Sequence, residues 1–362
     1  MDQQKRLIGI DLFRGLAIFA VVILHIDEEI PIHPNFWSQI TDFSLFAVPF
    51  FLAVSFYLAI SKLYSSRNPY PLRSRLTRIL VPYSFWSAFY LLYKVAKYAY
   101  VGESSKLLNL LNDPLSLIFF GGTSFHLYFL PLLAIGMLLV KSSEVFIKRN
   151  IPLKALCLIS LASFLSYEIL LMTGNEYQIG INIAFQNFLA SVFPTGNSNP
   201  ILRFVLIVIA CIIRSLPYVL VGMILSHPSS TQFHLKCING HPFIWLFIFL
   251  ISDGFGSQIL PQSLHEIIRG YSALLTAISF QSILKENYLI KNLGLCSFGI
   301  YLIHLFIVEI FQSIVKRVYP NYINQANTIM LIVASILVLL ISWSITLLIM
   351  RNKKLSGILF GQ

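Results

Sequence analysis

The apolar stretch 8–30 carries the ionisable side chains of Asp11, Arg14 and His25 along its length, before an acidic end. A charge at membrane depth costs at least about 2.5–3.5 kcal/mol on insertion scales, so it commonly marks a transport path or a reaction centre. In a helix, Arg14 and His25 would lie within about 20° of one face and about 16 Å apart along the axis. Asp11 is three residues before Arg14, where a carboxylate can pair with the guanidinium. The stretch therefore predicts a long, thin polar site.

Two further arginines, Arg75 and Arg78, lie directly before the third apolar run, 79–99. A helix places residues three apart on one face, and the planar guanidinium fork suits phosphate. Basic residues also flank the cytoplasmic ends of membrane spans as a rule, which is the simpler alternative. Arg14, near the same predicted surface, favours a phosphate site to which all three arginines contribute.

A hydroxyl, a phenol and an imidazole recur at helical spacing in Ser297, Tyr301 and His304. In a membrane helix such a stripe faces protein or water rather than lipid. It provides either substrate contacts or hydrogen bonds between helices, and the spacing favours neither. His126 and Tyr128 lie at the start of another apolar run, where His126 is either a site residue or an interfacial side chain and Tyr128 suits an interfacial anchor.

The composition is that of an integral membrane protein. Hydrophobic residues make up 57% of the chain, charged residues 11%, and the mean hydropathy is +0.76, whereas soluble domains carry about 25% charge. The net charge of +11 is therefore interpreted as a topology signal and not as a nucleic-acid surface. The four cysteines have no CxxC spacing, so we expect packing residues and no metal site.

The apolar runs predict an all-α fold, a polytopic integral membrane helical bundle of about ten transmembrane helices that forms one domain over 1–362. The runs are 8–27, 41–62, 79–99, 124–141, 153–173, 201–225, 243–260, 266–284, 296–316 and 326–350. The segment 181–194 is too short and polar to cross and is expected to be interfacial or re-entrant. The Lys and Arg distribution places both the N- and C-termini in the cytoplasm. His25 then lies toward the outer leaflet, with Asp27 and Glu28 directly after it.

These motifs together resemble the acyltransferase 3 family. Residues 10–25 resemble its opening arginine, ten intervening residues and histidine. Residues 75–83, 126–131 and 297–304 are similar to its later elements, and all four occur in order across nearly the whole chain. The chain departs from the family in two places, since Tyr128 replaces the usual Trp and Phe298 stands where Tyr is common. Both changes keep an aromatic ring and concern acceptor fit more than the reaction.

The resemblance implies an O-acyltransferase that takes an acyl group, most often acetyl, from cytoplasmic acetyl-CoA or another acyl-CoA. The group passes to a hydroxyl of a glycan or other small acceptor at the extracytoplasmic face. The residues expected to bind the donor are Arg14, Arg75, Arg78 and Asp11. The residues expected to bind the acceptor are His126, Tyr128, Ser297, Tyr301 and His304.

His25 is the candidate catalytic residue, because imidazole accepts protons near neutral pH. It acts either as a general base for the acceptor hydroxyl or as a nucleophile that forms a transient acyl-imidazole, and the sequence does not separate the two. Asp27 or Glu28 is expected to orient the ring or stabilise its protonated form. Glu28, at i+3, has the better helical spacing.

Two other functions are compatible with polar residues inside membrane spans. A transporter or exporter of a glycan or lipid-linked intermediate would also carry Arg and His along its path. A membrane sensor or scaffold would function without His25. The acyltransferase interpretation further predicts a multi-pass protein of the cell membrane, most consistent with a bacterial inner membrane. No hydrolase-like extracytoplasmic domain is apparent, so a second transfer step would require a partner protein.

Overall fold

In a computed structural model of the chain, the described residues are 7–28, 30, 34–66, 69–103, 105–106, 114–173, 200–230, 241–319 and 326–362. The regular elements among these residues are all helical, as predicted. They are α1 (Ile8–Ile23), α2 (Trp37–Ser44), α3 (Ala47–Ser65), α4 (Leu72–Val101), α6 (Pro114–Phe119), the 3₁₀ turn η1 (Phe125–Tyr128), α7 (Phe129–Lys148), α8 (Leu153–Met172), α10 (Pro200–Ser226), α12 (Pro242–Ile259), α13 (Gln262–Ser279), the 3₁₀ turn η2 (Phe280–Ser282), α14 (Tyr288–Val318), α16 (Thr328–Met350) and α17 (Lys353–Phe360). The segment 181–194, predicted to be interfacial or re-entrant, falls outside the described residues.

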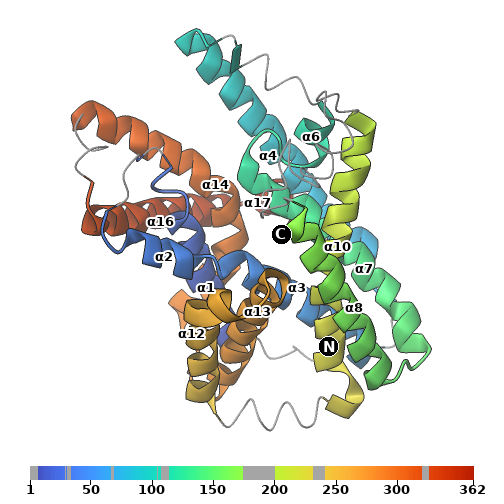
Figure 1. The fold of residues 1–362 in the computed structure, drawn as a ribbon. Coiled ribbons are helices and arrows are strands. Elements are labelled where there is room, and N and C mark those ends of the chain that lie inside the picture. The colour runs from blue at the N-terminus through green and yellow to red at the C-terminus, as the bar shows by residue number, and fades with distance from the viewer. Residues whose placement is uncertain are drawn as a thin grey trace. The chain divides into compact units, whose positions relative to one another are not determined.

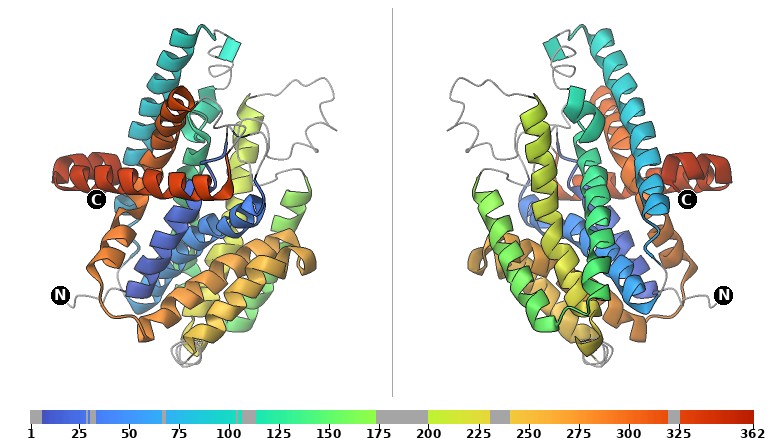
Figure 2. Two further views of the ribbon diagram at one scale, coloured as in Figure 1. Left: turned by 90° about the vertical axis from the view of Figure 1, so that its left-hand side faces the viewer. Right: turned by 90° about the vertical axis from the view of Figure 1, so that its right-hand side faces the viewer.

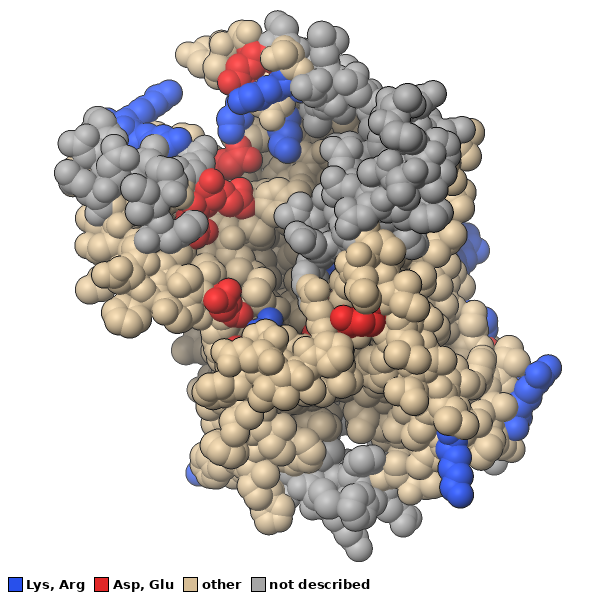
Figure 3. Space-filling model, viewed as in Figure 1, with Lys and Arg blue, Asp and Glu red and all other residues tan. Residues whose placement is uncertain are grey.

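Within the described part of the chain, eight helical segments are long and apolar enough to cross a membrane. One of them joins α2 and α3 into a single segment, Trp37–Ser65. The surface visible in Figure 3 is dominated by uncharged residues, as expected of helices that face hydrocarbon. The chain is thus a polytopic helical membrane protein.

The two remaining predicted spans also form helices, but both differ from the expectation. α1 ends at Ile23 instead of residue 27, and its 16 residues reach about 24 Å, less than the roughly 30 Å of a hydrocarbon core. α13 has 18 residues but includes His265, Glu266 and Arg269, which lower its apolar character. Three quarters of α1 is buried (12 of its 16 residues), so it is a core helix of the bundle.

By packing, the chain divides into two compact units, each built from separate segments. The first contains Met1–Val54, Phe233–Leu260 and His265–Ser356. In it, α1 contacts α2, α14 and α16, and α14 also contacts α16 (Figure 1). The ring of Phe249 lies 5.3 Å from that of Phe46 and 6.2 Å from that of Phe13, so an aromatic core joins α12 to the N-terminal segment.

The second unit contains Ser55–Gln232, Pro261–Leu264 and Gly357–Gln362. In it, α10 packs against both α7 and α8, and α7 also contacts α4 (Figure 2). Beside α4, the backbone N–H of Tyr70 donates to the Glu144 carboxylate of α7. Lys141 lies 2.9 Å from the same carboxylate, which therefore has both a hydrogen bond and a counter-charge.

Helix ends in the first unit follow from local sequence. The Asn287 side chain accepts hydrogen bonds from the backbone N–H groups of Leu289 and Ile290 at 2.8 and 3.2 Å, and so caps the start of α14. Lys316 and Arg317 occupy its last turn, where positive charge is favourable to the helix dipole. These signals are readable in the sequence and fix the extent of the helix that carries His304.

A buried ion pair joins α12 to α13. Arg269 Nε lies 2.6 Å from Asp253 Oδ1, and the two side chains are 11% and 2% exposed. His265 Nε2 also lies 2.9 Å from the backbone oxygen of Ser252. The charge of Asp253, which interrupts the apolar run 243–260, is thus compensated by a neighbouring helix.

Candidate active site

The candidate site lies where α1 and α14 run side by side in the same direction. Near their N-terminal ends, Asp11 packs closely against Gly294. A Cβ added to Gly294 would lie only 2.8 Å from the Asp11 Cα. Near the C-terminal end of α1, the rings of His25 and His304 have centroids 5.3 Å apart. The first and last predicted motifs, at opposite ends of the sequence, therefore meet at one helix pair.

Asp11 and Arg14 form the ion pair that their spacing predicts. Arg14 Nη1 lies 3.6 Å from Asp11 Oδ1, at a distance longer than a hydrogen bond. The Asp11 side chain is 1% exposed and that of Arg14 is 30% exposed. The carboxylate is thus fixed by burial against α14, while part of the guanidinium reaches the surface of this unit.

His25 lies in a turn directly after α1 and not inside a continuous helix. Its Nδ1 is 2.8 Å from Glu28 Oε1. A carboxylate only accepts, so the proton of this bond is on Nδ1, and Nε2 is the nitrogen with the acceptor lone pair. Of the two carboxylates that the sequence proposes as partners of His25, the structure brings Glu28 to the ring.

Asp27 is directed elsewhere. Its Oδ2 accepts a 2.7 Å hydrogen bond from the indole nitrogen of Trp37 on α2. Trp37 is fully buried and Asp27 is 8% exposed. This bond uses one of the two carboxylate oxygens, and the predicted function of Asp27 in orienting the His25 ring stays a prediction.

His304 is fully buried beside His25. Its Nδ1 is 2.6 Å from the backbone oxygen of Tyr301, which only accepts, so Nδ1 again carries the proton and Nε2 the acceptor lone pair. The Ser297 hydroxyl donates to the backbone oxygen of Gly294 at 2.9 Å, within its own helix. One member of the predicted stripe, His304, thus lies beside His25. An acceptor-binding function of Ser297, Tyr301 and His304 stays a prediction.

His126 and Tyr128 belong to η1 in the second unit. His126 is 3% exposed, its Nδ1 lies 2.9 Å from the Ser124 hydroxyl, and its ring meets that of Tyr90 edge-on at 5.1 Å. Tyr128 is half-buried. The structure therefore places His126 in a packed environment, and acceptor binding by either residue stays a prediction.

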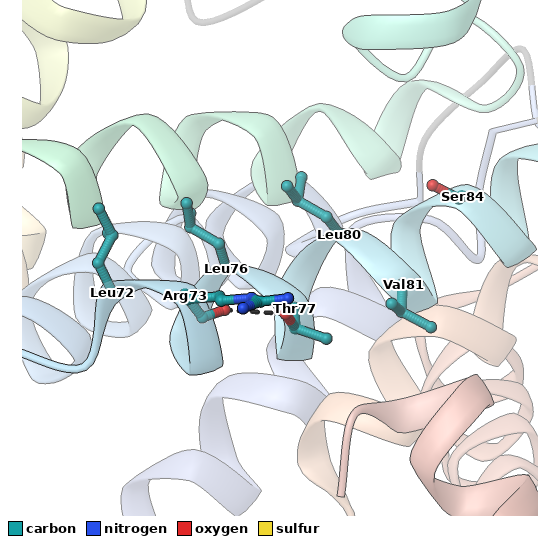
Figure 4. A pocket seen from close by; sticks show the side chains of 7 residues that line it. All are labelled: Leu72, Arg73, Leu76, Thr77, Leu80, Val81 and Ser84. Carbon is teal, nitrogen blue, oxygen red and sulfur yellow. Dashed lines mark hydrogen bonds between the residues drawn. The ribbon is translucent and has the colours of Figure 1, made fainter.

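Arg75 and Arg78 lie in the first turns of α4, beside two overlapping grooves. The first groove, of about 570 Å³, follows the helix and is lined by Leu72, Arg73, Leu76, Thr77, Leu80, Val81 and Ser84 (Figure 4). The second, of about 840 Å³, is lined by Tyr70, Pro71, Leu72, Arg73, Ser74, Thr77 and Arg78. Arg73 therefore lines both grooves, and Arg78 lines the second.

Arg75 does not line either groove, but its charge acts on Tyr70, which lines the second one. Its positive charge lowers the pKa of Tyr70, although burial of the phenol raises that pKa more strongly. Arg73 belongs to the same basic run but has no predicted function in the sequence, because spacing alone does not reveal which arginine faces the groove. Arg14 belongs to the first unit and Arg75 and Arg78 to the second, so their convergence on one phosphate group stays a prediction.

A comparison with protein-family models gives a match that covers nearly the whole chain. A family model described as an acyltransferase domain matches residues 7–347, and the match includes every site residue named above. No curated protein and no solved structure matches the chain. In the part of the chain that the structure describes, no group of three or more His, Cys, Asp or Glu side chains is arranged to hold a metal ion.

Proposed function

The chain belongs to the acyltransferase 3 family, and from this membership we propose that it transfers an acyl group from a cytoplasmic acyl-CoA to an acceptor hydroxyl at the extracytoplasmic face. Acetyl is the expected group, and a glycan or small hydroxyl compound is the expected acceptor. The observation that carries the proposal is the His25–Glu28 pair, with Nδ1 and Oε1 at 2.8 Å. It leaves Nε2 of His25 as the basic nitrogen at the end of α1.

In the proposed reaction, His25 Nε2 takes the proton of the acceptor hydroxyl while the hydroxyl oxygen forms a bond to the thioester carbonyl carbon. The carbon–sulfur bond then breaks, and the CoA thiolate leaves with the proton that the imidazolium returns. Glu28 stabilises the imidazolium through the Nδ1–H bond, since a hydrogen bond between two charged groups is stronger than a neutral one. In the alternative route, Nε2 attacks the thioester carbonyl carbon, the carbon–sulfur bond breaks and CoA leaves as the thiolate, so that the acyl group is carried as acyl-imidazole. The acceptor hydroxyl then attacks the acyl carbon and breaks its bond to Nε2, and the proton that the hydroxyl gives up balances the thiolate.

For the donor, we propose that arginines at the predicted cytoplasmic surface bind the phosphates of acyl-CoA. Arg14 offers a partly exposed guanidinium held by a buried carboxylate. On α4, the groove edged by Arg73 and Arg78 continues along Leu76, Leu80 and Ser84. Residues 73 and 84 are separated by about 16 Å of helix, and an anionic head followed by a long thin arm suits such a groove.

The test is release of label from acetyl-CoA by purified protein in lipid, comparing wild type with His25→Ala. His241→Ala is the matched control, since His241 is an exposed histidine of the same unit. We expect wild type and His241→Ala to discharge acetyl-CoA and His25→Ala to lose at least 99% of the rate, because a general base typically contributes about 10²–10⁴-fold.

Label retained on wild-type protein identifies the acyl-imidazole route. Equal rates in all three proteins would remove His25 from the reaction. Folded wild-type protein that neither binds nor discharges acetyl-CoA would favour the transporter instead.

A further inference from the structure

The turn that carries His25 is held from two sides by buried side chains of other helices. α1 ends at Ile23, and residues 24–28 form a turn. Directly after His25, the backbone oxygen of Ile26 accepts a 3.0 Å hydrogen bond from Gln312 Nε2 of α14. One residue later, the carboxylate of Asp27 accepts the 2.7 Å bond from Trp37 of α2.

These contacts are enclosed. Trp37 is fully buried, Ile26 is 1% exposed, Gln312 6% and Asp27 8%. A bond that water cannot replace restrains its partners more strongly than an exposed one, since breaking it leaves polar atoms unsatisfied. The two donors come from helices on different parts of the chain, so the turn is tied to both α2 and α14.

We infer that Trp37 and Gln312 are positioning residues that fix the His25 turn and thereby the direction of His25 Nε2. This inference rests on the proposed function, in which that nitrogen must meet the acceptor hydroxyl. The side chain of His25 is held by Glu28 within the turn itself, but a local pair only orients the ring relative to the turn. The orientation of the turn relative to α14 and to the His304 ring depends on Gln312 and on the Asp27–Trp37 bond.

The main variants are Trp37→Phe, which keeps an aromatic ring and removes the indole N–H, and Gln312→Met, which keeps the length and removes the amide. Asp27→Asn is the conservative variant, because its amide oxygen still accepts the indole proton. Trp343→Phe is the matched control. Trp343 Nε1 makes an equivalent 2.7 Å bond to Asn292 in the same unit, but this bond does not contact the His25 turn.

We expect Trp37→Phe and Gln312→Met each to lower kcat for acetyl transfer at least about tenfold, since a small misplacement of a reacting group is costly. KM for acetyl-CoA should stay within about twofold, because the arginines that bind the donor in the proposal are unchanged. Trp343→Phe should keep the wild-type kcat. The kcat of Asp27→Asn should be closer to that of wild type than the kcat of Trp37→Phe is.

Hydrogen–deuterium exchange of residues 24–28 supplies a readout that does not depend on activity. We expect faster exchange there in the two main variants, with the rest of α1 and the unfolding temperature close to wild type. A His25-dependent enzyme in which Trp37→Phe and Gln312→Met keep full kcat would overturn the inference, and so would unchanged exchange in the turn. If wild type transfers no acyl group, the proposed function fails, and exchange by itself still decides whether these side chains hold the turn.

Discussion

Replacing Gly294 by alanine tests the contact that sets α1 against α14. The new Cβ would lie 2.7 Å from the Asp11 Cβ, 2.8 Å from its Cα and 2.9 Å from its backbone oxygen. Carbon atoms prefer separations of about 3.5–4.0 Å, so the two helices would have to separate by about 1 Å. Two of the three opposing atoms are backbone, which cannot rotate away. Overpacking of this kind costs about 1–3 kcal/mol.

Gly254→Ala is the control that isolates this cost. Gly254 also lies inside a helix, but a Cβ added there meets nothing within 4 Å. Both substitutions gain up to about 1 kcal/mol of helix propensity, so the difference between the two variants reports the contact alone. We expect Gly294→Ala to be less stable than Gly254→Ala by about 1–3 kcal/mol.

The assay is thermal unfolding of the purified variants in detergent, followed by intrinsic fluorescence. For a chain of this size, each kcal/mol corresponds to roughly 2 °C, so Gly294→Ala should unfold about 2–6 °C below Gly254→Ala. Acyl transfer should also fall in Gly294→Ala, because the same displacement separates His25 from His304. Identical unfolding temperatures in the two variants would refute the close packing of Asp11 on Gly294.

Three further predictions concern a turn, an ion pair and the donor site. Gly121→Ala should lower the unfolding temperature, because Gly121 has φ +75° and its Cβ would lie 2.6 Å from a backbone nitrogen; an unchanged temperature would contradict this geometry. Asp253→Asn should cost about 3–5 kcal/mol by leaving the Arg269 charge uncompensated, whereas Asp253→Leu combined with Arg269→Met should recover most of that loss in the same assay. Arg14→Lys should weaken equilibrium binding of acetyl-CoA about tenfold although the charge is kept, since the planar fork is lost. An unchanged Kd would remove Arg14 from the donor site.

Local relations along the chain could be predicted from the sequence because helix geometry fixes them. Residues three apart on a helix or in the turn that continues it come together regardless of what surrounds them. The Asp11–Arg14 pair and the His25–Glu28 contact are both of this kind. The apolar runs likewise determine the helical class, since a backbone in lipid must satisfy its own hydrogen bonds.

The choice between Asp27 and Glu28 shows where local reasoning ends. Both carboxylates are near His25 in sequence, but the buried indole of Trp37 takes one of them. That donor lies ten residues away on another helix, and no periodicity of residues 8–30 reveals it. The second groove on α4 is a similar case, because only the surroundings of the helix decide that Arg73 and Arg78 line it while Arg75 does not.

The sequence by itself thus determined a helical membrane protein with Asp11 and Arg14 paired on its first helix, because hydropathy and helical spacing act over a few turns. Only the tertiary structure decided that α1 and α14 lie side by side, that His304 packs beside His25, and that Gln312 and Trp37 each donate a hydrogen bond to the turn between them. These contacts depend on how closely two helix backbones approach. That approach is set by the side chains of both partners, such as Gly294 against Asp11, and not by the pattern of either helix alone.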